Sequence, residues 1–326
     1  MYLKDIEFSL WSDFIEREFL EGEFQKLIDQ GIINGATSNP AIFKEAILNS
    51  PAYRQQLAQL HDRDPKTKYE ALATTDIKRA AQILLPLFQK GDDGFVSIEV
   101  DPRLKDDADG TVEEAKRLLA MIDMPNVMIK VPVTPAGCAA IERLIADGVN
   151  VNATLIFSPN QADECLDAME AGFKKCQDSH SVLSIFVSRF DRKLDPLMEA
   201  KGLPKGRVGI MNAAKIYNMI KKRSLPNTKA LFASTGVKGG DYPPHYYISE
   251  LIAPHSVNTA PIHTIKAFVE SGDNRIKLPY KNEEIERFFA ELKANGIDMK
   301  KVYDELLHEG LEAFVEAFEQ ILKELQ

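Results

Sequence analysis

Residues 127–137 read VMIKVPVTPAG, and this stretch combines the pattern of a buried strand with the start of a helix. Its apolar positions are Val127, Met128, Ile129, Val131 and Val133. Such a continuous, largely β-branched run is typical of a strand that is covered on both faces. Pro132 and Gly137 lead from the end of this strand into a segment of helical spacing. A strand that passes directly into a helix is the repeating unit of α/β proteins.

The same unit recurs along the chain. Apolar runs predict eight strands, of which the first and last are the weakest, at residues 7–12, 32–38, 94–100, 127–133, 151–157, 182–188, 229–234 and 255–259. Helical spacing lies between them, for example at 113–122, 136–148 and 160–176. This alternation implies right-handed crossovers and a parallel sheet. Eight units predict an α/β fold of the (β/α)8 or TIM barrel type, and a doubly wound open sheet is the alternative.

Two segments are too long for single crossover helices. We expect several helices at about 40–90, and two more in a C-terminal helical extension at 281–326. The extension has amphipathic spacing and is expected to lie across the barrel or at a subunit contact. Because no linker rich in Pro, Gly or Ser divides the chain, residues 1–326 are expected to form a single barrel domain with these extra helices.

Composition and charge narrow the class of protein. With 44% hydrophobic and 27% charged residues, the chain has the composition of a soluble globular protein. Its net charge of −9 argues against a nucleic-acid binder. No apolar run reaches the roughly 20 residues that span a membrane. Three cysteines without a CxxC pair and the absence of a leader pattern at the N-terminus predict a cytoplasmic protein. No metal or cofactor is expected, because neither ligand spacing nor a nucleotide fingerprint is present.

Lys130 stands in the middle of the apolar run 127–133, where a charge is costly unless the protein uses it. A buried lysine can form a Schiff base with a ketone or aldehyde, because desolvation and nearby cations lower its pKa and supply free amine near neutral pH. Such chemistry needs an acid/base, and Glu99 at the end of run 94–100 suits that role. The pair predicts a class I aldolase-type reaction. The alternative is a structural ion pair between Lys130 and Glu99.

Other polar residues follow the predicted strands at their carboxyl ends, where barrel enzymes keep their active sites. They are Asp13, Asn39, Asn152, Thr154, Ser184 and Ser234. Asn152 with Thr154, and Ser184 with Phe186, are two apart on their strands and so project together. Structural roles are the alternative for each: Asp13, Asn39 and Ser158 are placed to cap helices, and Thr154 is an ordinary strand residue. Glu99 could equally be a solvated acid beside Asp101, and Arg189 could pair with Asp191 or Asp195.

Six motifs together resemble those of the transaldolase family, in its order and at its spacing. They are GATSNPAIF (35–43), IEVDPRL (98–104), VMIKVPVTPAG (127–137), VNATLIFS (151–158), SIFVSRFD (184–191) and ALFASTGVKG (230–239). The resemblance covers most of the chain and implies a (β/α)8 barrel with extra helices. It implies transfer of a dihydroxyacetone unit from sedoheptulose 7-phosphate to glyceraldehyde 3-phosphate, giving erythrose 4-phosphate and fructose 6-phosphate. This transferase reaction of the non-oxidative pentose phosphate pathway needs no cofactor. Transaldolases with such a tail are often homodimers.

The resemblance also implies roles for individual residues. Lys130 matches the Schiff-base lysine, Glu99 the acid/base that acts through a water, and Thr154 the residue that helps to hold this water. Asp13, in the less distinctive motif LWSDF, matches the acid that takes the proton from the C4 hydroxyl of the donor. The positions that match contacts to bound dihydroxyacetone are Asn39, Asn152 and Ser184.

The phosphate site departs from the family pattern at one position. Arg189 matches a phosphate-binding arginine and Ser234 a second phosphate contact. Many members carry another arginine two residues after this serine, but Gly236 stands there. We therefore expect Lys238 to supply the second cation, without the bidentate fork of arginine.

Two other functions compete with transaldolase. Fructose 6-phosphate aldolases resemble this family but release dihydroxyacetone, and they typically carry glutamine in place of Glu99 and tyrosine in place of Phe186. The third reading is a sugar-phosphate-binding barrel without catalysis, since fold does not fix function. Lys130, Glu99 and Thr154 occurring together favour an enzyme, and Glu99 and Phe186 favour the transferase.

Overall fold

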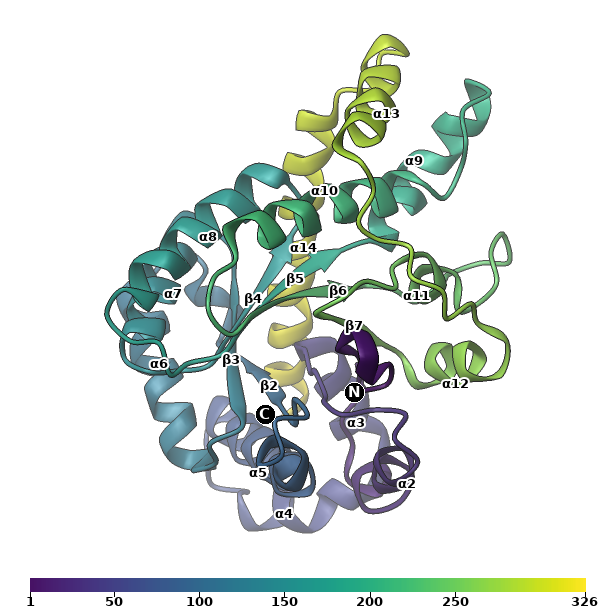
Figure 1. The fold of residues 1–326 in the computed structure, drawn as a ribbon. Helices are drawn as coiled ribbons and strands as arrows, with labels where there is room; N and C mark the ends of the chain where they lie inside the picture. Colours follow the sequence, from purple (N-terminus) through teal and green to yellow (C-terminus); the bar gives the residue numbers. More distant parts are fainter.

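The computed structural model describes all residues 1–326 and contains one parallel sheet of seven strands. The sheet curls strongly, with helices around its outer face (Figure 1). Its strands pair in the order β1-β7-β6-β5-β4-β3-β2, so neighbours in the chain are neighbours in the sheet throughout β2 to β7. A doubly wound sheet reverses its strand order at a switch point, so that alternative is wrong. The strands are β1 (Phe8–Ser12), β2 (Val96–Glu99), β3 (Val127–Pro132), β4 (Val151–Ile156), β5 (Ser181–Phe186), β6 (Thr228–Ala233) and β7 (Ser256–Ala260).

The strand expected at 32–38 does not form, and this is a correction to the sequence-based prediction. Only Ala36 makes β-bridges, one to Ser12 of β1 and one to Val96 of β2. The Ala36 N–H donates to Phe95 O at 2.9 Å, and the Ser97 N–H donates to Ala36 O at 3.1 Å. Asn34 and Gly35 precede Ala36 and Asn39 follows it closely, and asparagine and glycine are depleted in strands. The segment therefore links the two edge strands without forming a strand, and Gly35 O and the Thr37 N–H complete the hydrogen bonds to Ser12 of β1.

Helices follow the strands and fill the long insertions. The α-helices are α1 (Arg17–Phe19), α2 (Gln25–Asp29), α3 (Pro40–Asn49), α4 (Arg54–Gln59), α5 (Pro65–Phe88), α6 (Ala108–Ile122), α7 (Pro135–Ala146), α8 (Pro159–Phe173), α9 (Ser188–Ala200), α10 (Val208–Arg223), α11 (Tyr246–Glu250), α12 (Ile262–Ser271), α13 (Asn282–Ala294) and α14 (Met299–Glu324). A π-helical turn, η2 (Leu20–Phe24), joins α1 to α2, and the 3-10 turns are η1 (Lys4–Ile6), η3 (Pro51–Tyr53) and η4 (Pro102–Leu104).

Three of the helices that leave the carboxyl end of the sheet begin in the same way, with a capping side chain followed by proline. Asn39, Thr134 and Ser158 each accept a backbone N–H from the first turn of α3, α7 and α8. Proline fits the next position because its missing N–H would have no partner there. In α7 the following Gly137 is required, since a β-carbon on it would lie 1.9 Å from Pro132 O. These signals fix the points at which the chain leaves the carboxyl end of the sheet.

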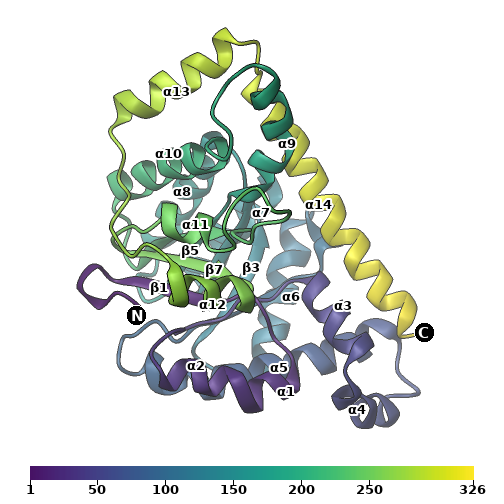
Figure 2. The same ribbon diagram turned by 90° about the vertical axis from the view of Figure 1, so that its right-hand side faces the viewer.

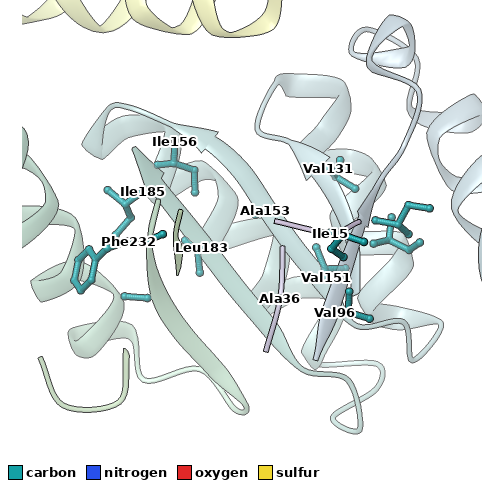
Figure 3. Close-up of a cluster of buried hydrophobic side chains, with 14 of the residues drawn as sticks. Ile15, Ala36, Val96, Val131, Val151, Ala153, Ile156, Leu183, Ile185 and Phe232 are labelled. Atoms are coloured by element: carbon teal, nitrogen blue, oxygen red, sulfur yellow. The ribbon is translucent and has the colours of Figure 1, made fainter. Parts of the chain in front are cut away.

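Alternation along the strands divides the apolar side chains into two cores. The larger core lies between the sheet and the helices and includes Ile129 and Val131; Figure 3 shows part of it. The smaller core includes Met128, and its strand side chains fill the inside of the curl. Lys130 is two residues from Met128 and therefore points to the inside, toward the carboxyl end of β3.

The last helix, α14, has 26 residues and crosses the carboxyl end of the sheet. It passes behind the strands in Figure 1, and in Figure 2 it runs along the side of the molecule opposite the N-terminus. Contacts with β4, α3 and α9 fix it there. Of the two places expected for the C-terminal extension, the structure shows the one across the sheet.

Candidate active site

Three polar side chains form a row across neighbouring strands at the carboxyl end of the sheet. Glu99 of β2 pairs in register with Lys130 of β3, and Lys130 pairs with Asn152 of β4. Residues paired in a parallel sheet project to the same face, so all three point inside the curl. Lys130 is 5% exposed; its Nζ donates to Ser38 O at 3.1 Å and lies 3.6 Å from Glu99 Oε2. The charged neighbour of this lysine is a carboxylate and not the expected cation.

Glu99 is a buried acid with unused hydrogen-bonding capacity. It is 6% exposed, which excludes the solvated role, and both of its carboxylate oxygens lack a hydrogen-bond partner. Burial raises the pKa of Glu99 to about 7; Lys130 offsets part of this rise and the nearby Asp13 adds to it. A carboxyl group with this pKa can both take and give a proton near neutral pH, which a general acid/base requires.

Asp13 lies just beyond β1, and its carboxylate faces the same region as Lys130. Thr37 Oγ1 donates to Asp13 Oδ1 at 2.7 Å. Burial raises the pKa of Asp13, while the Lys130 ammonium and the Thr37 hydroxyl lower it. The expected alternative role as a helix cap is wrong, because Glu16 caps α1. Asp13 is therefore available to act on a bound molecule.

A chain of hydrogen bonds orders the polar groups beside Lys130. Ser184 Oγ donates to Asn152 Oδ1 at 2.6 Å, and Asn152 Nδ2 donates to Ser97 Oγ at 3.0 Å. Thr154, two residues after Asn152, is fully buried and its hydroxyl has no partner. Buried hydroxyls are nearly always hydrogen-bonded, so this group is poised for a ligand or a water.

Asn39 has a structural role that the sequence also predicted. Its Oδ1 accepts the Ile42 N–H at 3.0 Å and caps α3. Ser158 caps α8 in a reciprocal capping box with Gln161. Because the cap uses only the oxygen of the Asn39 amide, the nitrogen is left for other contacts.

Arg189, at the start of α9, lies on a platform of aromatic rings. Its guanidinium carbon is 5.1 Å from the ring centre of Phe186 and 6.0 Å from that of Phe157. It forms no ion pair, and burial together with the neighbouring Arg192 cation lowers its pKa. Only the more distant Glu309 offsets part of this lowering, so the cation has no direct acidic partner and is available to an anion.

The acids that could have neutralised Arg189 are engaged elsewhere. Asp191 accepts the Gly209 N–H at 3.1 Å and the Tyr247 hydroxyl at 2.9 Å. Asp195 accepts the Gly206 N–H and the Tyr242 hydroxyl, at 2.8 and 2.7 Å. The alternative pairing of Arg189 is thus wrong.

Ser234 and Lys238 lie on the loop after β6. Ser234 has φ of 55°, and its hydroxyl lies 3.1 Å from that of Ser188 at the start of α9. Lys238 is exposed and lines a cavity of about 240 Å³ together with Ser188 and Arg192. The loop therefore faces α9, but no contact joins Lys238 to Arg189. Arg192, which the sequence analysis did not select, is a second cation of this cavity.

Phe314 of α14 is another residue that the sequence analysis missed. Its buried ring centre lies 5.6 Å from Lys130 Nζ. Thr37, Ser38 and Ser97 were missed as well, although the first two belong to the motif GATSNPAIF. Phe314 could not be assigned from sequence, because amphipathic spacing in the tail does not say what its apolar face covers.

Another cavity lies at the opposite end of the sheet and has a different lining. It measures about 810 Å³, and its lining includes Met128, Val182 and Lys229 at the amino-terminal ends of β3, β5 and β6. Its buried acid, Asp93, is paired with Lys229 at 2.6 Å and with the Trp11 indole at 3.2 Å. The strand lysine at this end, Lys229, is more exposed than Lys130 and is already engaged by Asp93.

Two further observations concern metals and membranes. No group of three or more His, Cys, Asp or Glu side chains is arranged to hold a metal ion. None of the helices combines the length and the apolar character that crossing a membrane requires.

The profile of a known family matches almost the whole chain. This profile, described as "Transaldolase/Fructose-6-phosphate aldolase", covers residues 10–325. The chain belongs to this family. Among its relatives in the transaldolase/fructose-6-phosphate aldolase family is a transaldolase from Campylobacter jejuni (strain RM1221), 48% identical over 98% of this chain and 99% of that protein. A transaldolase from Helicobacter pylori (strain Shi470) is 44% identical over 97% of this chain and 98% of the relative.

Proposed function

We propose that this protein is a transaldolase, a Schiff-base-forming transferase of the non-oxidative pentose phosphate pathway. It transfers a dihydroxyacetone unit from sedoheptulose 7-phosphate to glyceraldehyde 3-phosphate and yields erythrose 4-phosphate and fructose 6-phosphate. The single observation that carries the chemistry is Lys130, buried inside the curl with Glu99 3.6 Å away. Near full-length identity to transaldolases supports the substrate class.

Lys130 and Glu99 carry the covalent steps. The amine of Lys130 adds to the C2 carbonyl of the donor, and the resulting carbinolamine loses water to give an iminium. Glu99 accepts a proton from the lysine as the amine forms and returns one to the departing hydroxyl, with Thr154 holding the water through which it acts. The iminium withdraws electrons from the bond between C3 and C4, so that bond can break.

Asp13 and the amide and hydroxyl groups act on the rest of the sugar. Asp13 takes the proton of the C4 hydroxyl as the bond breaks, which releases the aldehyde and leaves an enamine on Lys130. Asn39, Asn152 and Ser184 hold the hydroxyl groups of the dihydroxyacetone unit. The hydrogen bonds from Ser184 to Asn152 and from Asn152 to Ser97 support this role, because they restrict the orientation of the Asn152 amide.

The phosphate end of the substrate binds at α9 and the β6 loop. Arg189 supplies the main cation, with its guanidinium stacked on Phe186, and Ser234 adds a hydroxyl. Lys238 supplies a second cation from the loop. The shared cavity of Lys238 and Ser188, whose hydroxyl lies 3.1 Å from that of Ser234, supports this placement.

Replacement of Lys238 by alanine is expected to raise KM for both sugar phosphates about threefold to tenfold, as for a lost solvent-exposed charge contact. The kcat should stay near its wild-type value, because Lys238 does not touch the reacting carbons. Steady-state kinetics with each phosphate substrate measure this. Lys201→Ala is a matched control, because Lys201 is another exposed lysine and lies just after α9. Unchanged KM values in the Lys238→Ala variant would make Arg192 the better candidate.

Reductive trapping tests the proposed function directly. The protein is treated with borohydride in the presence of fructose 6-phosphate and then digested. The masses of its peptides are measured by mass spectrometry. A three-carbon or six-carbon adduct is expected on the peptide that carries Lys130. Absence of any adduct on this peptide would refute the enzyme and leave a sugar-phosphate-binding barrel.

An assay without acceptor separates transaldolase from fructose 6-phosphate aldolase. With fructose 6-phosphate alone, we expect release of glyceraldehyde 3-phosphate to stop at about one equivalent per site, because the enamine needs an acceptor. Adding erythrose 4-phosphate should restore turnover. Sustained release of dihydroxyacetone would instead assign the aldolase activity.

Three further proposals concern the closure of the barrel, the domain organisation, and the location and assembly of the enzyme. Residues 35–37 take the place of the eighth strand and close a (β/α)8 barrel, since their backbone groups form hydrogen bonds with both β1 and β2. Residues 1–326 form a single domain, with the additional helices packed on it. The enzyme acts on its sugar-phosphate substrates in the cytoplasm. A homodimer is the proposed assembly.

A further inference from the structure

We propose that Gly310 of α14 is a specificity-determining residue, because its missing side chain leaves the space in which the phosphate-binding guanidinium of Arg189 sits. This inference rests on the proposed function and adds the last helix to the site. It concerns the preference of the enzyme for phosphorylated over unphosphorylated substrates.

Gly310 lies in the interior of a long helix, where glycine is about 1 kcal/mol less favourable than alanine. The backbone there does not need glycine, since its φ is not positive. Position 310 lacks room for a side chain. A β-carbon added to Gly310 would lie 3.2 Å from Leu155 Cδ2, 3.2 Å from Phe157 Cε2 and 3.3 Å from Arg189 Nη1. A methyl group at 310 would therefore press on all three side chains.

Two of these three neighbours have little room to move. Leu155 and Phe157 are fully buried. Leu155 also sits at the irregularity in β4 with φ of 57°, which fixes the direction of its side chain. Arg189 is only partly buried and ends in a long, flexible side chain. The guanidinium is therefore the group that a methyl would displace.

The helix itself is anchored by contacts along its length. Tyr303 donates to Asn212 Oδ1 at 3.0 Å near its start. Lys193 of α9 pairs with Glu309, the residue beside Gly310, at 2.8 Å. At the far end, Lys68 Nζ donates to the carbonyl of Leu325 at 2.8 Å. A larger side chain at 310 must be accommodated locally.

One face of α14 thus touches both ends of the site. Phe314 is four residues after Gly310 and lies on the same side of the helix. Its ring is 5.6 Å from Lys130 Nζ, whereas Gly310 meets Arg189. The helix fixes the cation that binds phosphate relative to the amine that binds the carbonyl.

The test is the variant Gly310→Ala, with Gly22→Ala as the matched control because a β-carbon at Gly22 meets nothing within 4 Å. We expect KM for fructose 6-phosphate to rise about tenfold, as for a weakened hydrogen bond to a charged group. The kcat should stay within about twofold, because Lys130 is untouched. Trapping of dihydroxyacetone itself on Lys130 by borohydride should be unchanged, because this ketone carries no phosphate.

Two measurements keep this proposal separate from the proposed function. Inorganic phosphate binding, followed by calorimetry, does not need turnover and should weaken about tenfold in Gly310→Ala. A double-mutant cycle with Arg189→Lys should show that Gly310→Ala has almost no further effect on phosphate binding once the guanidinium is gone. Circular dichroism melting confirms that each variant is folded.

Three results would overturn the inference. They are wild-type phosphate binding in Gly310→Ala, additive effects in the double-mutant cycle, and an equal loss of dihydroxyacetone trapping. Failure of the wild-type protein to form any adduct with fructose 6-phosphate would instead refute the proposed function. The calorimetric measurement of phosphate binding would still decide the role of Gly310.

Discussion

Arginine in place of Lys130 abolishes transfer of the dihydroxyacetone unit, with an expected loss in kcat of about a thousandfold or more, as for removal of a covalent nucleophile. Guanidinium stays protonated in proteins and cannot add to a carbonyl. The variant keeps the positive charge opposite Glu99, so the loss reports the nucleophile and not the ion pair. A coupled assay of erythrose 4-phosphate formation measures it, and no adduct should form with borohydride.

Lys229→Arg is the matched control for this variant. Lys229 also lies on a strand and pairs with a buried carboxylate, Asp93, at 2.6 Å. It belongs to the opposite end of the sheet, so near wild-type activity is expected. Measurable transfer by Lys130→Arg, with a melting curve like that of wild type, would exclude Lys130 as the Schiff-base residue.

Glutamine in place of Glu99 is expected to lower kcat by about a hundredfold to ten-thousandfold, the usual range for general acid/base catalysis. The pH dependence gives a second signature. Because burial raises the pKa of Glu99 to about 7, its carboxylate dominates above this pH and its neutral acid below it. Only the carboxylate can accept a proton from Lys130, so wild-type activity should fall as the pH drops through about 7. This fall should disappear in Glu99→Gln.

The measurement is kcat/KM for fructose 6-phosphate across pH 5.5–9, on wild type and variant. Glu114→Gln is the control, because Glu114 is another buried acid but bonds to the Asp101 N–H and to Lys66 and does not face Lys130. It should keep the wild-type profile. A Glu99→Gln enzyme that still loses activity through pH 7 would assign the titration to another group, and Asp13 would be the first to examine.

Sequence patterns predicted the strands well where the physical signal was strong. The seven strands that form begin and end within about two residues of the predicted runs, because buried β-branched stretches have few alternatives. The eighth prediction, at 32–38, was wrong. Its apolar start, Ile32 and Ile33, resembles a strand, but the residues around Ala36 favour turns and only Ala36 makes bridges.

Within the candidate site, position along a strand was the useful signal. Lys130, Glu99 and Asn152 were selected separately, and the parallel register places them side by side. The register itself could not be read from sequence, since it depends on the pairing of strands that are up to about 30 residues apart. The predicted environment of Lys130 was also only partly right: it is buried, but beside carboxylates.

Contacts from distant parts of the chain were outside the reach of sequence analysis. Ser38 acts through its backbone carbonyl, which any residue could supply. Phe314 and Gly310 approach the site because α14 packs over it, some 180 residues after Lys130 in the chain. No local pattern specifies such a contact. The loop with Lys238 depends in the same way on how it folds against α9.

The place of α14 has a consequence for the protein during its synthesis. All seven strands and Lys130 leave the ribosome before residues 299–324, and domains begin to fold as they emerge. Until the last turn of the helix is released and Lys68 can bind the Leu325 carbonyl, the wall that contains Phe314 and Gly310 is missing. A nascent chain that has not yet released residues 299–324 therefore lacks the contacts of Phe314 with Lys130 and of Gly310 with Arg189, and this side of the site forms only when the last helix docks.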